Sequence, residues 1–448
     1  MRGAEFLRGE FTRIGGYKLV AMIAGGLVAT FASWALVNRF GVAGYALYTL
    51  LATLLIMLPF ADLGLGAAVV NLTADFSAGR LTTANYEFAY HKIRRILIGV
   101  GGIICAVSVT LYSTTGFAFI VGPDLSSRTT DAAVAAVLIT IAVSLPFGAG
   151  ARILQGAGRT DLMTKITLLN PATQFGLLIA ALACGLEYPY VALAPAVAFL
   201  ATTVFTDHAS RRIINANIGI FASYKKRERR VGGSAVQNLW KTSVAFLVMS
   251  TGMLLIFQMQ RIIVVHLAGP IQLAEFSLIA QYLIPILALI VAVSQALWPR
   301  FRSSKDGPTP EAFARTVRLF AYCGILAGVL LSALVLGVSS LLLNGEVETS
   351  WASMLGAALY LFAMSVFQPC SMLLTMTDGL RVQAALTVVA SGMSILVSLL
   401  VTPTLGAAGG LLAAGASVLL LQAIPLLVLS RRYVAYQKTL SGVFQERL

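Results

Sequence analysis

The stretch "KKRERRVGG" (residues 225–233) lies in the longest charged and polar segment of the chain, 208–240. The sequence on each side of this segment consists largely of long apolar runs. A transmembrane helix needs about 20 mainly apolar residues. Twelve runs come close to this length, six before the segment and six after it: 17–37, 43–70, 96–121, 132–155, 165–186, 190–207, 241–265, 274–298, 319–343, 350–376, 380–402 and 406–429.

The composition also indicates a membrane protein. The 448 residues are 58% hydrophobic and only 11% charged, whereas a soluble domain has about 25% charged residues. We therefore predict an all-α polytopic membrane protein. The net charge of +14 first suggests a nucleic-acid partner, but the basic residues fall in short clusters between apolar runs, as in cytoplasmic loops. We expect no nucleic acid to bind.

The placement of the basic residues predicts the orientation of the chain. With both termini in the cytoplasm, 29 of the 32 Lys and Arg residues fall in the cytoplasmic segments, leaving Arg39, Arg128 and Arg261. This asymmetry is typical of inner-membrane proteins and supports an even number of spans. We expect a bacterial inner-membrane protein.

The two sets of six spans resemble one another. "GRTDLMTK" (158–165) and "TMTDGLRV" (375–382) follow the fourth span of each set. We predict two lobes related by a parallel repeat: an N-terminal lobe, 1–215, a basic cytoplasmic linker, 216–240, and a C-terminal lobe with its tail, 241–448. Repeated transporter halves enclose a central substrate cavity and work by alternating access.

Several functional classes are disfavoured. The chain contains no P-loop, no His/Cys metal-ligand spacing and no polar stretch long enough for a soluble catalytic domain. We therefore expect neither an enzyme nor a bound cofactor or metal. An H⁺ or Na⁺ gradient remains as the energy source of a transporter.

Arg261 is the most informative charged residue. It lies in the seventh run, "TGMLLIFQMQRIIVVHLAG", with Gln258 and Gln260 nearby. Arginine stays charged and offers planar, bidentate donors that suit phosphate. One interpretation is an anion contact in the cavity. The other is a structural arginine that extends to the periplasmic interface or pairs with Glu275.

Other polar residues also have two possible roles each, one in substrate binding and one in the structure. Arg39 ends the first span at the corresponding place in the other repeat, as a second anion contact or an interfacial anchor. Three cations lie at cytoplasmic span ends, where they attract an anionic headgroup or only set the topology: Lys18, Lys241 and Arg300. Three glutamines contact sugars or join helices: Gln258, Gln260 and Gln281.

An aspartate interrupts the apolar stretch "LPFADLGLGAAVVN" (58–71). Asp62 follows Pro59 and precedes Gly64 and Gly66, which indicates a bent helix end. We favour a structural role over a proton or ion relay. In that role the carboxylate accepts backbone N–H groups or pairs with an arginine of the loop after the second or the fourth span. We place the other acidic residues except Glu275 in loops and tails, so the membrane interior is expected to be poor in carboxylates.

The chain resembles the oligosaccharide flippases of the multidrug/oligosaccharidyl-lipid/polysaccharide exporter superfamily. The resemblance rests on "NRFGVAGYALYTLLATLLIMLPFADLGLGAAVVN" (38–71) and on similar matches at four other places: "ILQGAGRTDLMT" (153–164), "QRIIVVHLAGPIQLAEFSLIAQYL" (260–283), "ALWPRFRSSKDG" (296–307) and "PTLGAAGGLLAAGAS" (403–417). An Asp often precedes the Arg-Ile-Ile motif in this family, where this chain has Gln260.

The resemblance implies a flippase for an undecaprenyl-pyrophosphate-linked oligosaccharide that is used for O-antigen, capsule or exopolysaccharide. Arg261 and Arg39 would then meet the pyrophosphate. A polysaccharide polymerase and ligase would be its partners beside the lipid bilayer. Two alternatives stay open: an ion-coupled multidrug or cation antiporter of the same superfamily, and a non-transporting assembly partner of a polysaccharide synthase.

Overall fold

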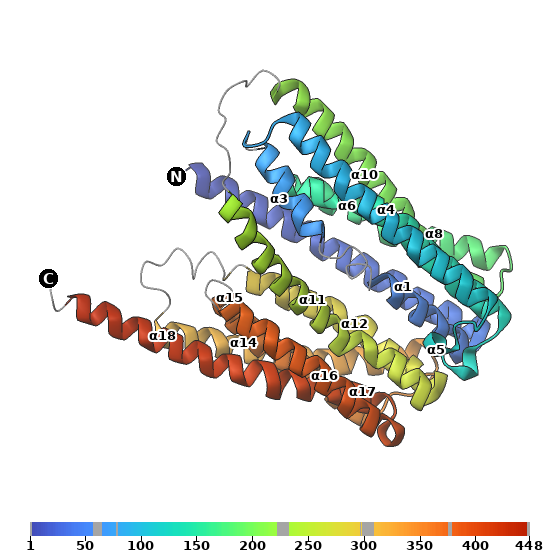
Figure 1. Cartoon of the computed structure of the whole chain (residues 1–448). Coiled ribbons are helices and arrows are strands. Elements are labelled where there is room, and N and C mark those ends of the chain that lie inside the picture. The colour runs from blue at the N-terminus through green and yellow to red at the C-terminus, as the bar shows by residue number, and fades with distance from the viewer. Residues whose placement is uncertain are drawn as a thin grey trace. The chain divides into compact units, whose positions relative to one another are not determined.

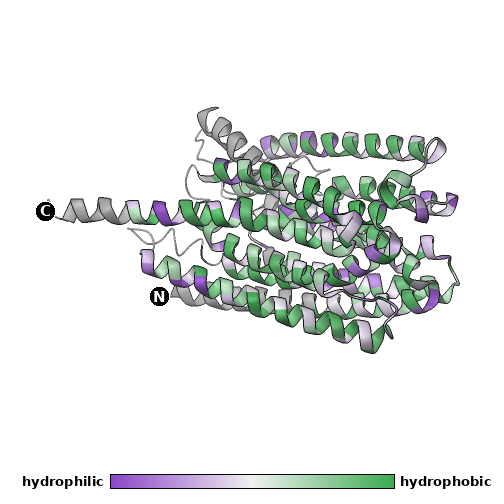
Figure 2. Ribbon diagram, turned by 90° about the horizontal axis from the view of Figure 1, so that it is seen from below, coloured by the Kyte–Doolittle hydropathy of each residue, from purple (hydrophilic) through white to green (hydrophobic). Residues whose placement is uncertain are grey.

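The computed structural model describes residues 2–56, 65–77, 79–221, 233–295, 297, 309–374 and 379–445. These residues form helices and connecting turns, with no strand among them. The chain divides into two compact units, Met1–Ser243 and Val244–Leu448, which are described separately below. Apolar residues predominate along the helices, as Figure 2 shows.

The described part of the chain contains eleven helices that are long and apolar enough to cross a membrane. The first, within α1 (Arg2–Ile56), is two helices joined at Gly41, whose φ of 72° requires glycine. Phe31 and Tyr48 lie on opposite sides of Gly41, yet both contact α8: the Phe31 ring packs 5.1 Å from that of Phe175, and Gln174 Nε2 donates to Tyr48 Oη at 2.8 Å. The chain therefore turns back at Gly41, which confirms the prediction of twelve spans.

The first unit is organised around its fourth span, α6. Figure 1 shows α6 beside α4 and α10, and these pairs make the most extensive contacts of the unit, followed by α3 with α6. The elements of this unit after α1 are α3 (Leu65–Ser77), α4 (Thr83–Ser113), α5 (Ala118–Val121), η1 (Pro123–Leu125), α6 (Arg128–Gly156), α7 (Thr160–Thr167), α8 (Leu169–Ala183), α9 (Tyr188–Val191) and α10 (Ala194–Phe221).

Glycines allow α6 to approach its neighbours closely. A Cβ atom added at Gly101 of α4 would lie 2.7 Å from the backbone oxygen of Ala142 in α6. A Cβ atom at Gly150 would lie 2.7 Å from the backbone nitrogen of Asp207 in α10. Apolar side chains gain little by leaving lipid for a protein interior, so membrane helices associate through such close packing of small residues.

The second unit repeats this arrangement around its own fourth span, α15. That helix packs most extensively against α14 and α17, the third and sixth spans of this unit, as α6 packs against α4 and α10. The shared pattern supports the predicted repeat. The elements are α11 (Gly233–Leu267), α12 (Gly269–Gln295), α14 (Pro310–Gly337), η2 (Val338–Leu342), α15 (Trp351–Leu374), α16 (Gly379–Leu405), α17 (Ala407–Val418), η3 (Leu419–Ala423) and α18 (Ile424–Gln445).

The segment predicted as a linker, 216–240, is helical at both ends. Helix α10 continues to Phe221 and α11 begins at Gly233, while residues 222–232 lie outside the described part of the chain. Two π-type segments, η2 and η3, extend the spans formed by α14 and by α17 with α18.

Candidate functional site

Arg261 is buried within the second unit. It lies on α11, and only 5% of the residue is exposed. Its guanidinium carbon is 5.9 Å from the centre of the Phe276 ring on α12. A cation over an aromatic face at this distance gains roughly 0.5–2 kcal/mol, more where water is excluded. The side chain that the sequence singled out therefore has an apolar, aromatic environment.

Aromatic rings from three helices surround this position. Phe257 lies one turn before Arg261, and its ring centre is 5.5 Å from that of Phe276. Tyr360 of α15 packs against Phe257 at 4.9 Å. The rings are buried, and an ionised group beside them loses much of its hydration, which makes it costly unless it performs a function or is held by partners.

The two glutamines near Arg261 point in different directions. Gln258 precedes Arg261 by three residues and therefore lies on the same side of α11. It is buried, and its Oε1 has no hydrogen-bond partner among the described residues. Gln260 donates from Nε2 to Ile256 O and to Ser394 Oγ of α16, both at 2.9 Å. The contacts of Gln260 thus match the helix-joining alternative, whereas Gln258 can complement Arg261.

Glu275, which the structural interpretation pairs with Arg261, contacts the start of another helix. Its Oε1 accepts the backbone N–H of Ser350 at 2.6 Å, directly before α15 begins. This buried carboxylate therefore stabilises a helix start. Gln281, six residues further along α12, is half-buried.

The remaining candidates have less support. Arg39 is exposed and lies 5.7 Å from the centre of the neighbouring Phe40 ring, as expected for the interfacial anchor. Lys18 and Lys241 belong to α1 and α11, but their side chains are outside the described set. Asp62 and Arg300 also lie outside the described residues, so their roles stay predictions.

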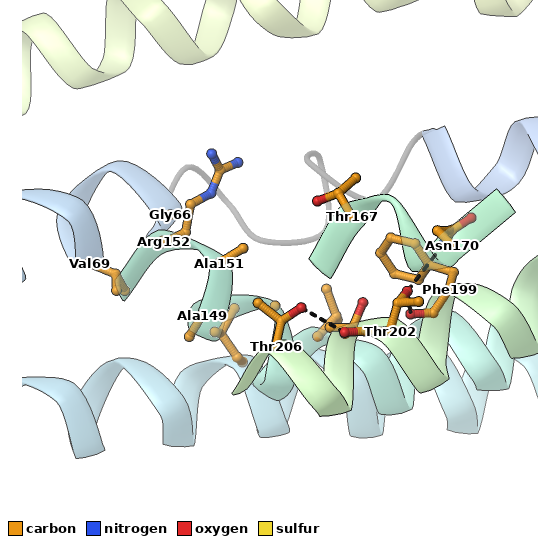
Figure 3. A pocket seen from close by; sticks show the side chains of 14 residues that line it. Gly66, Val69, Ala149, Ala151, Arg152, Thr167, Asn170, Phe199, Thr202 and Thr206 are labelled. Carbon is orange, nitrogen blue, oxygen red and sulfur yellow. Dashed lines mark hydrogen bonds between the residues drawn. The ribbon is translucent and has the colours of Figure 1, made fainter. Parts of the chain in front are cut away.

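A cavity of about 320 Å³ lies inside the first unit. Figure 3 shows Arg152 and Asn170 towards opposite ends of it, with Thr202 and Thr206 of α10 between them. Its lining comes from α3, α4, α6, α7, α8 and α10: Gly66, Val69, Leu97, Leu145, Gly148, Ala149, Ala151, Arg152, Thr167, Asn170, Phe199, Thr202, Thr203 and Thr206.

Most polar groups of the cavity are hydrogen-bonded to its walls. Asn170 Nδ2 donates to Thr202 Oγ1 at 3.2 Å. Thr206 Oγ1 donates to the Thr202 carbonyl at 2.7 Å, and Thr167 Oγ1 donates to that of Met163 at 2.8 Å. Arg152 differs, since the described part of the chain supplies no hydrogen-bond or ion-pair partner for its guanidinium. From the sequence it was counted among the cytoplasmic cations, at the end of the predicted span 132–155, and the structure places it within α6.

The placement of acidic residues in loops is wrong for Asp131 and Asp207, which are buried in α6 and α10. Asp207 was placed in a loop, but it lies in α10 within a membrane-spanning helix and is only 3% exposed. Its Oδ2 is 2.6 Å from a guanidinium nitrogen of Arg211, one turn later. The spacing of four residues was a usable signal for this pair. The burial of Asp207 could not be predicted from the sequence, because it depends on the contact of α10 with Gly150.

No group of three His, Cys, Asp or Glu side chains in the described ranges could hold a metal ion.

Comparisons with solved structures find transporters of similar fold. An inward-facing multidrug resistance MATE family transporter of the MOP superfamily superposes with a TM-score of 0.62 at 12% identity, covering 94% of this chain and 99% of that one. A MOP superfamily transporter from Pyrococcus furiosus superposes with a TM-score of 0.53 at 14% identity, covering 96% of each chain. The chain has the fold of MOP superfamily transporters. No protein-family model and no curated protein matches it.

This MOP fold accounts for the two units of six spans and for the multi-pass membrane character of the chain. At 12–14% identity, the likeness concerns the fold alone, because one fold can carry sites of different chemistry. What is transported must therefore be argued from the side chains above.

Proposed function

We propose that this chain is a flippase that moves undecaprenyl-pyrophosphate-linked oligosaccharide across the bacterial inner membrane for polysaccharide biosynthesis. The observation that carries the proposal is Arg261, a buried cation against the Phe276 ring in a membrane-spanning helix. A guanidinium forms short, charge-assisted and often bidentate hydrogen bonds with phosphate oxygens. Gln258, on the same side of α11, offers further hydrogen bonds to a polar headgroup or sugar.

The charge of this site favours an anionic substrate. The buried carboxylate nearest to Arg261 in sequence, Glu275, is engaged by the Ser350 backbone. An exporter of organic cations needs negative groups that face its substrate, and Arg261 would repel such a substrate. The Pyrococcus furiosus transporter of this fold is itself described as having a binding pocket of reverse polarity that suggests a different function.

A cation or drug antiporter is the second candidate, because solved structures of this fold include multidrug resistance transporters. The buried carboxylate of Asp207 in α10 is the feature of this chain that favours it. The coupling ion, H⁺ or Na⁺, is part of both candidates.

The test is a flipping assay with the full chain in proteoliposomes. The probe is a fluorescent undecaprenyl-pyrophosphate-linked N-acetylglucosamine, whose outer-leaflet population is quenched by dithionite. Hydrogen bonds to charged groups contribute about 1.5–3 kcal/mol, so Arg261→Gln is expected to lower the flipping rate by about tenfold or more. Arg261→Lys should retain part of the rate, since it keeps the charge but loses the bidentate geometry.

Arg128→Gln is the matched control. Arg128 also lies over an aromatic ring, 4.3 Å from that of Tyr112, but it is exposed, and its loss should change the rate less than twofold. Flipping that persists unchanged in Arg261→Gln would reject the anion site. Wild-type protein that carries ethidium against a pH gradient but does not flip the lipid would establish the antiporter instead. If it carries neither probe, the assembly-partner alternative gains support.

A further inference from the structure

A π-type segment interrupts the twelfth span. Residues Leu419–Ala423 form η3 between α17 and α18, and the backbone N–H of Ile424 bonds to the Leu419 carbonyl. A turn of π-helix holds one residue more than an α-helical turn and often lies at a functional position. The sixth span, its counterpart in the predicted repeat, is the continuous α-helix Ala194–Phe221. The repeat therefore also accommodates this span in an α-helical form.

The π-type segment buries an amide that has no partner. Gln422 is 0% exposed, and neither its Nε2 nor its Oε1 has a hydrogen-bond partner among the described residues. A buried polar group left unsatisfied costs about 1–3 kcal/mol. Gln383 of α16 is equally buried, but its Oε1 accepts from Ser371 Oγ at 2.7 Å and its Nε2 donates to the Ser371 carbonyl at 3.3 Å. The described conformation thus disfavours the position of Gln422 in particular.

The packing of α17 against α15 sets the depth of Gln422. A Cβ atom added at Gly356 would lie 2.8 Å from the Leu411 Cβ, and one added at Gly415 would lie 3.0 Å from the Tyr360 nitrogen. The two helices therefore run in the same direction, and Gln422 lies near the level of Phe367. The undescribed residues after α15, 375–378, begin about 12 Å further along that helix.

The helix that follows the π-type segment can present a second apolar face. The buried residues of α18 recur every three to four positions: Leu426, Ser430 and Val434. Without the extra residue of the π turn, α18 would turn by about 100°, and Leu429 and Tyr433 would take the places of Ser430 and Val434. Pro425 has no N–H and makes no helical hydrogen bond in either arrangement, so none has to break there.

We propose that the twelfth span switches between this π register and an α register, in which α18 turns by about 100° relative to α17 and Gln422 leaves its unpaired position. The other π-type segment, η2, is held by its own contact, since Ser339 Oγ donates to the Val347 carbonyl at 2.5 Å. The inference goes beyond the proposed function, because it concerns the conformation of one unit and holds for any transported substrate.

Distances between spin labels, measured by double electron–electron resonance, test the switch. The full chain is placed in lipid nanodiscs with its four cysteines replaced by alanine. Labels are attached at Tyr322→Cys of α14 and Tyr436→Cys of α18, where both native side chains are exposed. We expect two populated distances, because the turn moves the end of a side chain on α18 by up to about 8 Å.

A second label pair is the control for this measurement. Tyr322→Cys and Leu355→Cys, an exposed position of α15, lie on helices that precede the π-type segment. This pair should give one distance. A single distance for the pair that includes Tyr436→Cys, or two distances for both pairs, would overturn the proposal.

Gln422→Leu tests the cause of the switch. Leucine removes the amide that is unpaired in the π register and forms no hydrogen bond in the α register, so one of the two populations should fall at least about fivefold. The melting temperature should rise. Gln383→Leu is the matched control, because it removes a paired amide, and it should lower the melting temperature while both distances remain. Unchanged populations in Gln422→Leu, or a lower melting temperature in both variants, would contradict the switch.

Discussion

Replacing Gly150 by leucine is expected to prevent the first unit from folding. The smallest side chain at this position would already bring its Cβ atom to 2.7 Å from the backbone nitrogen of Asp207 and 3.0 Å from the Asp207 Cβ. The obstacle is the backbone of α10, which cannot move aside as a flexible side chain can. Overpacking usually costs about 1–3 kcal/mol, and separating two membrane helices forfeits their remaining contacts as well. We expect little monodisperse protein after detergent extraction.

Gly148→Leu is the matched control, because it makes the same substitution two residues earlier on the same helix. No atom lies within 4 Å of a Cβ atom added there, and leucine favours a helix over glycine by roughly 0.5–1 kcal/mol. Its yield and melting temperature should match the wild type. Similar losses in both variants would mean that α6 does not tolerate side chains generally, and the close approach of α6 to α10 would not be the cause.

Removing the arginine partner of Asp207 is expected to produce the second large effect. In Arg211→Met the Asp207 carboxylate, whose side chain is 4% exposed, loses the guanidinium at 2.6 Å. Breaking a buried pair typically costs about 3–5 kcal/mol, since it leaves an uncompensated buried charge. The Arg211 side chain is 41% exposed, and solvent screening weakens its interaction with Asp207. We therefore expect Arg211→Met to lower the free energy of unfolding by about 2–3 kcal/mol. The free energy of unfolding in detergent with added denaturant measures this.

An exposed ion pair of equal length provides the control. Arg80 Nη2 and Asp75 Oδ1 are also 2.6 Å apart, but the two side chains are 56% and 40% exposed. Arg80→Met should therefore lower the free energy of unfolding by less than about 1 kcal/mol. The double variant Asp207→Leu with Arg211→Met should recover most of the stability lost in Arg211→Met, because no buried charge remains. A double variant as unstable as the sum of the two single ones would show that burial of the carboxylate is not the cause.

Much of the fold follows from the sequence because the membrane imposes simple requirements. Every backbone polar group must be satisfied within the bilayer, so apolar runs of sufficient length become helices. The asymmetry of Lys and Arg supports an even number of spans, and Gly41 divides α1 into two of them. Arg261 was also recognisable, because a charge inside an apolar run is conspicuous before any partner is known.

The partners of each side chain could not be predicted in this way. Gln258 and Gln260 are two residues apart in one apolar run, yet Gln260 bonds to Ser394 of α16 and Gln258 does not. Asp207 and Arg152 were counted with the cytoplasmic loops, at the ends of the predicted spans 190–207 and 132–155. The structure places Asp207 in the contact of α10 with α6, and Arg152 in the lining of a cavity. In a soluble protein, apolar residues that recur every three to four positions would have indicated the buried face of each helix.

The sequence by itself determined that this protein is a helical membrane protein of twelve spans in two similar sets, with a cation in its seventh span. Only the tertiary structure decided which face of each helix meets another helix, and therefore that Arg261 lies against Phe276, that Asp207 is buried and that Arg152 lines a cavity. The physical reason is that lipid and protein interior are both apolar, so that the faces turned to either one have similar compositions, and close packing between particular residues selects the neighbours.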